Sequence, residues 1–203
     1  MKKLSRPAVQ KECTVEPDCL GAPTLEAWLE ANVINDPRAL HAIRGAECEA
    51  RIARAYRELL SGYDTDPSTI LNTTRQCDSD HAGVVTIRDI NFFSLCAHHF
   101  LPFFGTIDID YVPGDKIIGL GKFVRLVDAY SRRFQIQEDL VKEIALELMD
   151  SGGSLAVRVA SHSRHLCMCS RGPSDHTVGV TTTYTCGELK LIAQHGCEVP
   201  RGR

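Results

Sequence analysis

Two short segments of this sequence contain cysteine and histidine at spacings that suit a metal site. Cys96 and His99 lie three residues apart, and Cys167 follows His165 in a second segment farther along the chain. Two thiolates and one imidazole supply three ligands and leave a fourth tetrahedral position for water, as in catalytic zinc sites, whereas structural zinc usually has four protein ligands. The pattern therefore predicts one zinc ion that is bound by Cys96, His99 and Cys167 and activates water.

Each of these residues has a simpler interpretation when it is taken alone. His98 and His99 can be ordinary core or surface histidines, and Cys167 can be a buried apolar side chain. Cys169 is a competing ligand, because residues two apart on a strand share a face. Two separate Cys/His clusters, each beside a loop with glycine and arginine, favour the metal site over these alternatives.

Basic residues in several segments predict an anion-binding site in a chain whose formal net charge is −3. Lys122 and Arg125 are three residues apart at the start of an expected helix, where free backbone N–H groups also suit a phosphate. Arg171 follows the second metal segment, and Arg51 and Arg54 share a face of an earlier helix. The alternative is a solvated basic face, but the metal ligands nearby favour a phosphate clamp that positions a substrate.

Glu138 is a carboxylate that follows a group of cations, Arg132 and Arg133, in the sequence. A carboxylate can accept two N–H bonds from the edge of guanine, just as Asp and Glu accept from a base amine. The residue types therefore indicate a small phosphorylated substrate, and Glu138 is suited to accept hydrogen bonds from a base such as guanine.

The elements that must position these residues are visible in the hydrophobic pattern. Residues 24–63 read as helical, since Ile52, Tyr56 and Leu60 fall four apart on one face and Gly62 ends the run. Strand patterns follow at Val84–Ile87 and Thr106–Val112, and after a turn at Pro113–Asp115 a return strand, expected to form a hairpin with Thr106–Val112, begins at Lys116–Gly119. Two helices are expected next, over Lys122–Tyr130 and Gln137–Met149. Two further strands are expected at Leu155–Val159 and Val178–Thr185. This order predicts an α+β domain with an antiparallel sheet.

The pattern also predicts the domain organisation and the class of protein. We expect a mobile arm over residues 1–23, a helical region over 24–63 and a catalytic domain over 64–203. Hydrophobic residues make up 43% and charged residues 24%, as in soluble globular proteins. The negative net charge argues against a nucleic-acid binder, and no apolar run is long enough to span a membrane, so a cytoplasmic protein is expected.

The nine cysteines are an odd number, which disfavours a framework of disulfides and favours free thiols and metal ligands. Five of them have no recognisable ligand spacing, and we expect them to pack as small apolar side chains. These five are Cys13, Cys19, Cys77, Cys186 and Cys197.

Four linked segments together resemble a known enzyme family. They are Ser94–Gly105, Ile118–Lys122, Ser131–Glu138 and His165-x-Cys167-x-x-x-Arg171-Gly172. In this order and spacing they resemble GTP cyclohydrolase I, and the likeness runs from about Cys48 to Gly187. The resemblance implies a tunnelling fold, in which two helices pack on a four-stranded antiparallel sheet, plus an N-terminal helical extension. It also implies a toroidal homodecamer with active sites at subunit boundaries.

The resemblance assigns roles to the matching positions. It implies that Cys96, His99 and Cys167 bind zinc and that His98 and His165 are catalytic. It also implies that Lys122, Arg125 and Arg171 hold the triphosphate and that Arg51 and Arg54 contribute from a neighbouring subunit. Gln137 would contact the ribose, and Glu138 the guanine. The implied reaction opens the imidazole ring of GTP, releases formate from C8, and closes the rearranged product to 7,8-dihydroneopterin triphosphate.

The sequence departs from the family pattern in three places. Gly121 stands where a serine is common, Cys48-Glu49 replaces the usual Thr-Pro, and the tail after Gly187 differs. One alternative is therefore a divergent cyclohydrolase that acts on another purine nucleotide or releases a ring-opened pyrimidine. Another is a non-catalytic, zinc-stabilised nucleotide-binding regulator, against which the proton-transfer residues His98 and His165 argue.

Overall fold

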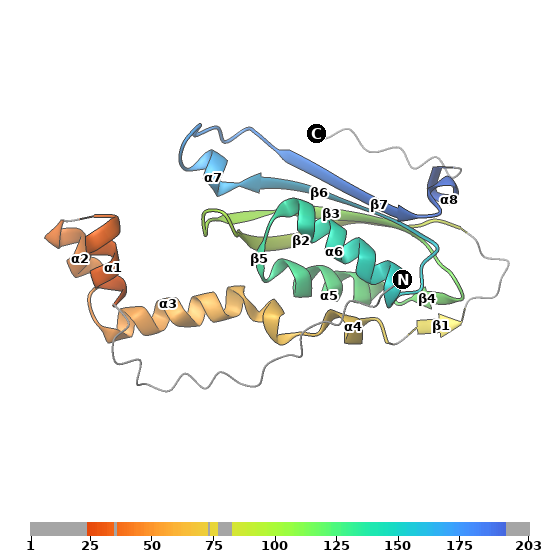
Figure 1. Ribbon diagram of the computed structural model, residues 1–203, viewed down its shortest axis with the longest axis horizontal. Helices are drawn as coiled ribbons and strands as arrows, with labels where there is room; N and C mark the ends of the chain where they lie inside the picture. The colour runs from red at the N-terminus through yellow and green to blue at the C-terminus, as the bar shows by residue number, and fades with distance from the viewer. Residues whose placement is uncertain (1–23, 35, 73, 77–82, 194–203) are drawn as a thin grey trace, which may run out of the picture. The chain divides into compact units, whose positions relative to one another are not determined.

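The structure is a computed structural model, and it describes residues 24–34, 36–72, 74–76 and 83–193 (Figure 1). The arm predicted over residues 1–23 and four of the cysteines, Cys13, Cys19, Cys77 and Cys197, lie outside the described residues. The chain forms two compact units, of which the first ends at Ala53 and the second begins at Arg54. The described helices include none that is both long and apolar enough to cross a membrane.

The first unit contains helices α1 (Leu25–Asn32) and α2 (Pro37–Ile43) and the start of α3 (Ala46–Leu59), which continues into the second unit. Both short helices have capped beginnings. The Thr24 hydroxyl accepts a hydrogen bond from the backbone N–H of Ala27, and the Asp36 carboxylate accepts one from Arg38. These side chains satisfy N–H groups that have no partner within the helix, and they set the starts of α1 and α2.

The second unit is built on one mixed sheet with the strand order β5-β2-β3-β6-β7. Its four long strands are antiparallel neighbours, and the two-residue β5 pairs in parallel with the end of β2. The strands are β2 (Val85–Cys96), β3 (Pro102–Val112), β5 (Phe134–Gln135), β6 (Ala156–His165) and β7 (Val180–Gly187). The remaining elements are η1 (Ser61–Asp64), α4 (Pro67–Ile70), β1 (Thr74–Gln76), β4 (Lys116–Ile118), α5 (Leu120–Ser131), α6 (Gln137–Asp150), α7 (Leu166–Cys169) and α8 (Leu189–Ala193).

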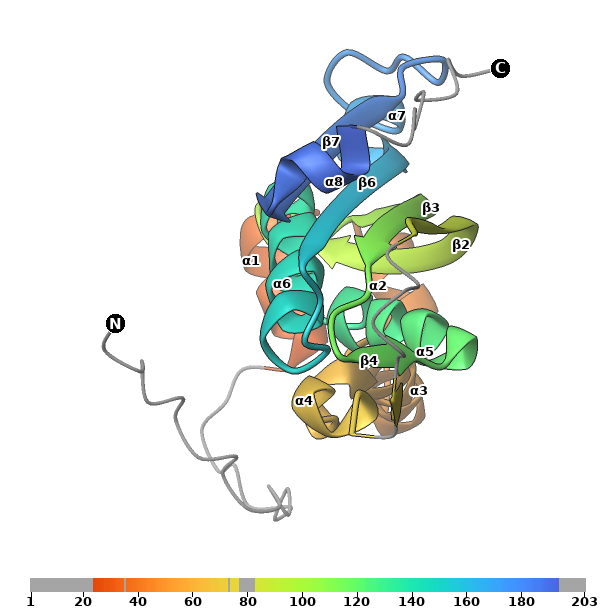
Figure 2. The ribbon, with the colours of Figure 1, turned by 90° about the vertical axis from the view of Figure 1, so that its right-hand side faces the viewer.

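The main core lies between one face of this sheet and the two helices α5 and α6 (Figures 1 and 2). Alternate residues of β3, Ile107, Ile109 and Tyr111, are buried on that face and belong to one cluster with Leu140 and Ile144 of α6. Strand alternation and the helical period bring these apolar sets together. The α+β tunnelling fold, with two helices on a four-stranded antiparallel sheet, is therefore confirmed.

The predicted hairpin between Thr106–Val112 and Lys116–Gly119 is wrong. Strand β4 instead pairs with β1 in a separate two-stranded sheet, with Thr74 opposite Ile118. Both edges of β3 are already occupied, because β2 and β6 pair with it along its length. The returning segment therefore has no free edge of β3 to join.

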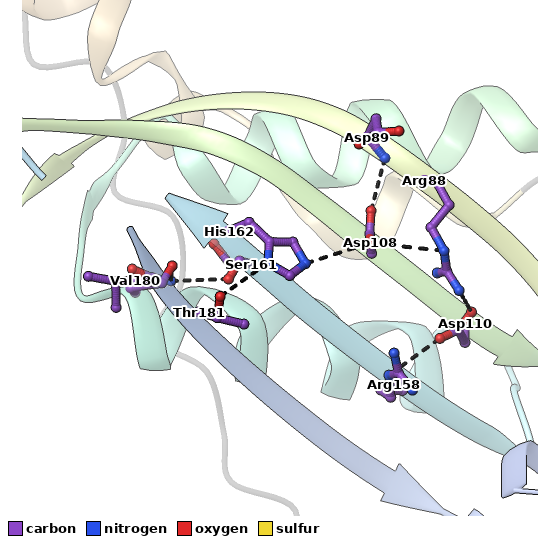
Figure 3. A network of polar contacts seen from close by, with 10 residues as sticks. Arg88, Asp89, Asp108, Asp110, Arg158, Ser161, His162, Val180 and Thr181 are labelled. Atoms are coloured by element: carbon purple, nitrogen blue, oxygen red, sulfur yellow. Dashed lines mark hydrogen bonds and ion pairs between the residues drawn. The ribbon is translucent and has the colours of Figure 1, made fainter. Parts of the chain in front are cut away.

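The opposite face of the sheet carries a polar network around two buried carboxylates (Figure 3). Asp110 accepts a hydrogen bond from Thr86 at 2.8 Å and forms ion pairs with Arg88 at 2.8 Å and Arg158 at 3.4 Å. Asp108 lies on the same strand face and has its own partners on two neighbouring strands. The network thus joins β2, β3 and β6 across the sheet.

The partners of Asp108 complete this network (Figure 3). Its carboxylate accepts a hydrogen bond from the backbone N–H of Asp89 at 2.9 Å and lies 3.6 Å from the Nε2 atom of His162. The other ring nitrogen of His162 is 3.2 Å from the Thr181 hydroxyl of β7. Asp89 has a positive φ of 57° at the irregularity between Ile87 and Ile90, and this bend directs its N–H toward Asp108.

Candidate metal centre and active site

Cys96, His99 and Cys167 come together at one end of the sheet. Their ligand atoms all lie within 4.8 Å of one another. Tetrahedral zinc with bonds of about 2.0–2.3 Å needs ligand atoms roughly 3.3–3.8 Å apart, so small side-chain rotations would close the site. Cys96 ends β2 and is buried, His99 is exposed in the following loop, and Cys167 is half-buried in α7.

The loop between β2 and β3 presents the two histidines through a tight turn. The backbone N–H of Phe100 donates to the Cys96 carbonyl at 2.9 Å, and the Cys96 N–H donates to Leu101 at 2.8 Å. Phe100 has a φ of 61°, which is unfavourable for a bulky residue. Its ring packs against Tyr56 and Phe134, with centroids 5.1 and 4.6 Å away. These aromatic contacts stabilise a strained turn beside the metal ligands.

The two neighbouring thiols of Cys96 and Cys167 indicate that the cluster suits a cation. Burial, and then the nearby Cys96 thiol, raise the pKa of Cys167, whereas the charge of Arg171 lowers it. A divalent ion would favour both thiolates, because it supplies the positive charge that the site otherwise lacks. The donor set of two sulfurs and one imidazole therefore fits zinc.

Cys169 is not part of this cluster. The sequence argument placed Cys167 and Cys169 on a strand, but both lie in α7, directly after β6 ends. Two steps along an α-helix turn the side chain by about 200°, so the residue two positions on points to the opposite side. The alternative that Cys167 and Cys169 both face the metal assumed a strand, whereas both residues lie in a helix.

His165 is held beside the cluster by a buried glutamine. The side-chain oxygen of Gln137 lies 2.7 Å from the Nε2 atom of His165 and 2.6 Å from the Ser163 hydroxyl. The His165 ring also stacks on Phe103, with centroids 4.5 Å apart and planes within 7°. Burial lowers the pKa of His165, and the Glu138 carboxylate opposes that shift.

The predicted site residues that line one pocket, of about 200 Å³, come from four elements and the loop between β2 and β3. They are Cys96, His98, His99, Gln137, Glu138, His165 and Cys167. The pocket also includes Ile136, Met168 and Val180, which the sequence analysis did not single out. Ser163, which donates a hydrogen bond to Gln137, was also not predicted from the sequence, although alternation on a strand places it on the same face as His165.

Gln137, like Cys96, is a buried member of this pocket, and only 2% of it is exposed. Its amide nitrogen donates to the carbonyls of Ser161 and Val180, at 3.3 and 3.2 Å. Both ends of the amide are therefore occupied within the chain. The predicted contact with a ribose would require one of these hydrogen bonds to break.

Lys122 and Arg125 do not line this pocket. Cys96 ends β2, whereas β3 and β4 lead to α5 from the opposite end of the sheet, where Val85 pairs with Tyr111. Helix α5 then runs back alongside the sheet over 12 residues, about 18 Å (Figure 1). Lys122, in its first turn, is thus at the far end, and Arg125, midway along α5, lines a separate hollow of about 410 Å³.

The other predicted cations are exposed. Arg171 follows α7, close enough for its charge to act on the Cys167 thiol. Arg51 and Arg54 are exposed residues of α3 on either side of the boundary between the two units. One chain therefore brings Arg171 to the metal cluster but leaves Lys122 at the other end of the sheet and Arg125 in a separate hollow.

The model of the family described as GTP cyclohydrolase I matches residues 38–200. The chain belongs to the GTP cyclohydrolase I family. Members of this family are enzymes, and the pocket around Cys96, His99 and Cys167 is accordingly the candidate active site of a cyclohydrolase.

Curated relatives agree with this assignment. The chain is 45% identical over 122 residues to GTP cyclohydrolase 1 of Campylobacter lari, covering 60% of this chain and 64% of that protein. It is 41% identical over 141 residues to GTP cyclohydrolase 1 of Alkalilimnicola ehrlichii, covering 70% and 76%. It is 40% identical over 151 residues to GTP cyclohydrolase 1 of Mycobacterium ulcerans, covering 73% and 74%. The match therefore spans just under two thirds of the first of these proteins and about three quarters of the others.

Proposed function

We propose that this protein is a zinc-dependent GTP cyclohydrolase I that converts GTP to 7,8-dihydroneopterin triphosphate and formate. The observation that carries the proposal is that Cys96, His99 and Cys167 share one pocket with His165 and Glu138. Metal ligands, a proton-transfer group and a base-binding carboxylate are the three functions that the reaction requires. The enzyme would act in the cytoplasm, in pterin and tetrahydrofolate biosynthesis.

Cys96, His99 and Cys167 would hold the zinc ion. When bound, the ion supplies a Lewis acid that lowers the pKa of water to about 7. The chain itself must place C8 of the purine against this position and manage the protons of ring opening. His98 is suited to assist, because its Nδ1 atom lies 3.8 Å from the Cys96 sulfur and its side chain is exposed to the pocket.

His165 and Glu138 would act on the purine directly. Imidazole can both accept and donate a proton near neutral pH, so His165 can accept a proton on one ring nitrogen and pass it to a nitrogen of the purine as the ring opens. Glu138 is exposed at the pocket and can accept two N–H bonds from guanine. Together they would orient the base and serve the proton transfers of ring opening.

The triphosphate would be bound by cations from more than one copy of the chain. Arg171 lies beside the metal cluster of its own chain, whereas Lys122 is in the first turn of α5 at the far end of the sheet and Arg125 lines another hollow. A second subunit would supply Lys122 and Arg125 to the same substrate, and Arg51 and Arg54 are further candidates from a neighbouring subunit. A homo-oligomer, of which the toroidal decamer is the proposed form, would therefore complete the site.

The test is an assay of the purified, zinc-loaded protein with GTP. We expect formate and, after oxidation, a fluorescent pterin to appear, and guanosine to be a much poorer substrate because it lacks the triphosphate. GTP that is bound without release of formate would instead support the non-catalytic regulator. Equal turnover of GTP and guanosine would contradict the proposal that the protein binds the triphosphate.

A divergent cyclohydrolase is the second candidate, and Gly121 favours it. A serine hydroxyl beside the ribose could relay a proton during the late rearrangement, and glycine has none. An added Cβ at Gly121 would meet no atom within 4 Å, so close packing does not require the glycine. This candidate predicts a ring-opened pyrimidine, or a product from another purine nucleotide, in the same assay.

A further inference from the structure

The amide of Gln137 makes four hydrogen bonds that use both of its ends. Its nitrogen donates to the carbonyls of Ser161 and Val180, and its oxygen faces the Ser163 hydroxyl and the Nε2 atom of His165. These partners come from β6 and β7, whereas Gln137 is the first residue of α6. The side chain therefore links three elements at the edge of the active-site pocket.

Two backbone carbonyls fix the orientation of this amide. Carbonyl oxygens only accept hydrogen bonds, so the two N–H donors of Gln137 must face Ser161 and Val180. The reversed amide would place its oxygen against two other oxygens and lose both bonds. Because the burial of Gln137 excludes water as a substitute, the amide oxygen must face His165.

This orientation determines which nitrogen of neutral His165 carries the proton. An amide oxygen only accepts, so the 2.7 Å contact requires that the Nε2 atom of His165 donates. Phe103 fixes the plane of the same ring by stacking on it. Among the described residues, no group forms a hydrogen bond with the Nδ1 atom of His165, so that nitrogen is free to accept one from a ligand.

We propose that Gln137 is a positioning residue that holds His165 as the Nε2–H tautomer and makes Nδ1 the nitrogen presented to the substrate. This role rests on the proposed function insofar as His165 acts on the substrate. It differs from a contact between Gln137 and the ribose, which would use the amide for binding. A fixed tautomer matters because a catalytic imidazole with its proton on the wrong nitrogen cannot carry out its transfer.

The first test is nitrogen NMR of protein labelled with ¹⁵N-histidine, zinc-loaded and without nucleotide. We expect the Nε2 atom of neutral His165 to show the signal of a protonated nitrogen and Nδ1 that of an unprotonated one. Gln137→Met keeps the length of the side chain but removes the acceptor, and we expect a mixture of tautomers. An Nδ1–H tautomer in the unmodified protein, or an unchanged pattern in Gln137→Met, would overturn the proposal.

Two matched variants separate positioning from folding. Gln137→Glu retains an acceptor opposite His165 but loses both donors, so the Nε2–H signal should persist even if stability falls. Ser163→Ala removes the other donor to the same oxygen and should leave the His165 signals unchanged. Loss of the Nε2–H signal in Gln137→Glu would contradict the proposal, and the result holds even if Gln137→Met fails to fold.

Kinetics with GTP provide the second readout. A positioning role predicts that Gln137→Met lowers kcat by about ten- to a hundredfold and changes KM less than threefold, as for other residues that orient a functional histidine. A raised KM with unchanged kcat would assign Gln137 to ribose binding instead. Release of no formate by the unmodified protein would refute the proposed function, while the NMR result would still decide the tautomer.

Discussion

The sheet of the second unit carries buried ionisable groups in two regions, and their partners differ. On one face, Asp108 and Asp110 have the cationic partners Arg88 and Arg158, and Asp108 also contacts His162, all on the neighbouring strands of the same chain. At the end of the other face, the thiols of Cys96 and Cys167 lie together, with no cation of the chain among the ligand atoms of their cluster. The first region has its counter-charges within one chain, whereas the second is a candidate metal site.

The difference separates a structural network from a binding site. A buried carboxylate that is paired and hydrogen-bonded holds strands together, and removing one partner leaves a charge that water cannot reach. A metal ion binds thiolates, so the cluster of ligand atoms loses protons and gains a cation when the metal binds. Buried charges thus need partners in both regions: arginine side chains provide them for the carboxylates, and a metal ion would provide them for the thiolates.

The largest expected effect is the loss of the metal. Cys167→Ala should abolish activity and lower the zinc content from about one ion per chain to near zero, since two ligands remain. Cys169→Ala is the matched control and should keep both zinc and activity. We would measure zinc by elemental analysis and activity by formate release; full zinc in Cys167→Ala with loss in Cys169→Ala would reverse the ligand assignment. Thermal stability should suffer less than activity.

The next largest effect is expected in the polar network around Asp108 and Asp110, where a substitution should lower the free energy of unfolding. Asp110 is 1% exposed, and Asp110→Ala would leave Arg88 and Arg158 without their shared carboxylate. We expect a loss of about 3–5 kcal/mol in the free energy of unfolding, measured by urea denaturation. Asp128→Ala removes an exposed ion pair with Arg132 and should cost less than about 1 kcal/mol. Similar losses of unfolding free energy in the two variants would show that the buried network stabilises the fold no more than an exposed ion pair does.

A smaller effect is expected at the phosphate-binding cations, and it tests whether the second region needs another subunit. Lys122→Ala or Arg125→Ala should reduce kcat/KM for GTP by about ten- to a hundredfold, since each charge-assisted bond contributes about 1.5–3 kcal/mol. Discrimination against guanosine should weaken in parallel. Unchanged kcat/KM in both variants would remove these residues from the site.

Mixed oligomers sharpen this test. A Lys122→Ala chain and a His165→Ala chain, unfolded and refolded together, should recover activity that neither has alone, because some sites would combine an intact Lys122 with an intact His165. The control is the same mixture of separately refolded proteins. Absence of recovery in an oligomer shown to be mixed would mean that one chain supplies both residues.

The smallest effect concerns Gly121. Formate release should remain competent, while pterin formation is slow relative to it, because no hydroxyl of residue 121 assists the late rearrangement. Gly121→Ser should narrow this gap several-fold, and the open space at Gly121 means that the fold should tolerate the change. If formate and the pterin form at the same rate from the earliest times and Gly121→Ser changes neither rate, then Gly121 has no effect on the reaction.

The sequence alone determined much of the architecture and of the metal cluster. The alternation of Ile107, Ile109 and Tyr111 and the helical spacing of Leu140, Ile144 and Leu148 specify which faces are buried, because side-chain direction follows the local backbone period. The pairing of Cys96 and His99 with Cys167 was likewise predictable, since zinc chemistry limits the residue types and their number.

Only the tertiary structure decided the remaining contacts. Asp108 and Asp110 alternate with apolar residues, as on a solvated face, yet they are buried because Arg88 and Arg158 reach them from strands distant in the sequence. The orientation of the Gln137 amide depends on carbonyls of β6 and β7, and the separation of Lys122 from the pocket depends on the route of the chain around the sheet. A local sequence pattern determines the direction of a side chain but not which residue it contacts in the tertiary structure. Burial and hydrogen bonding depend on the side chain and on that contacting residue together.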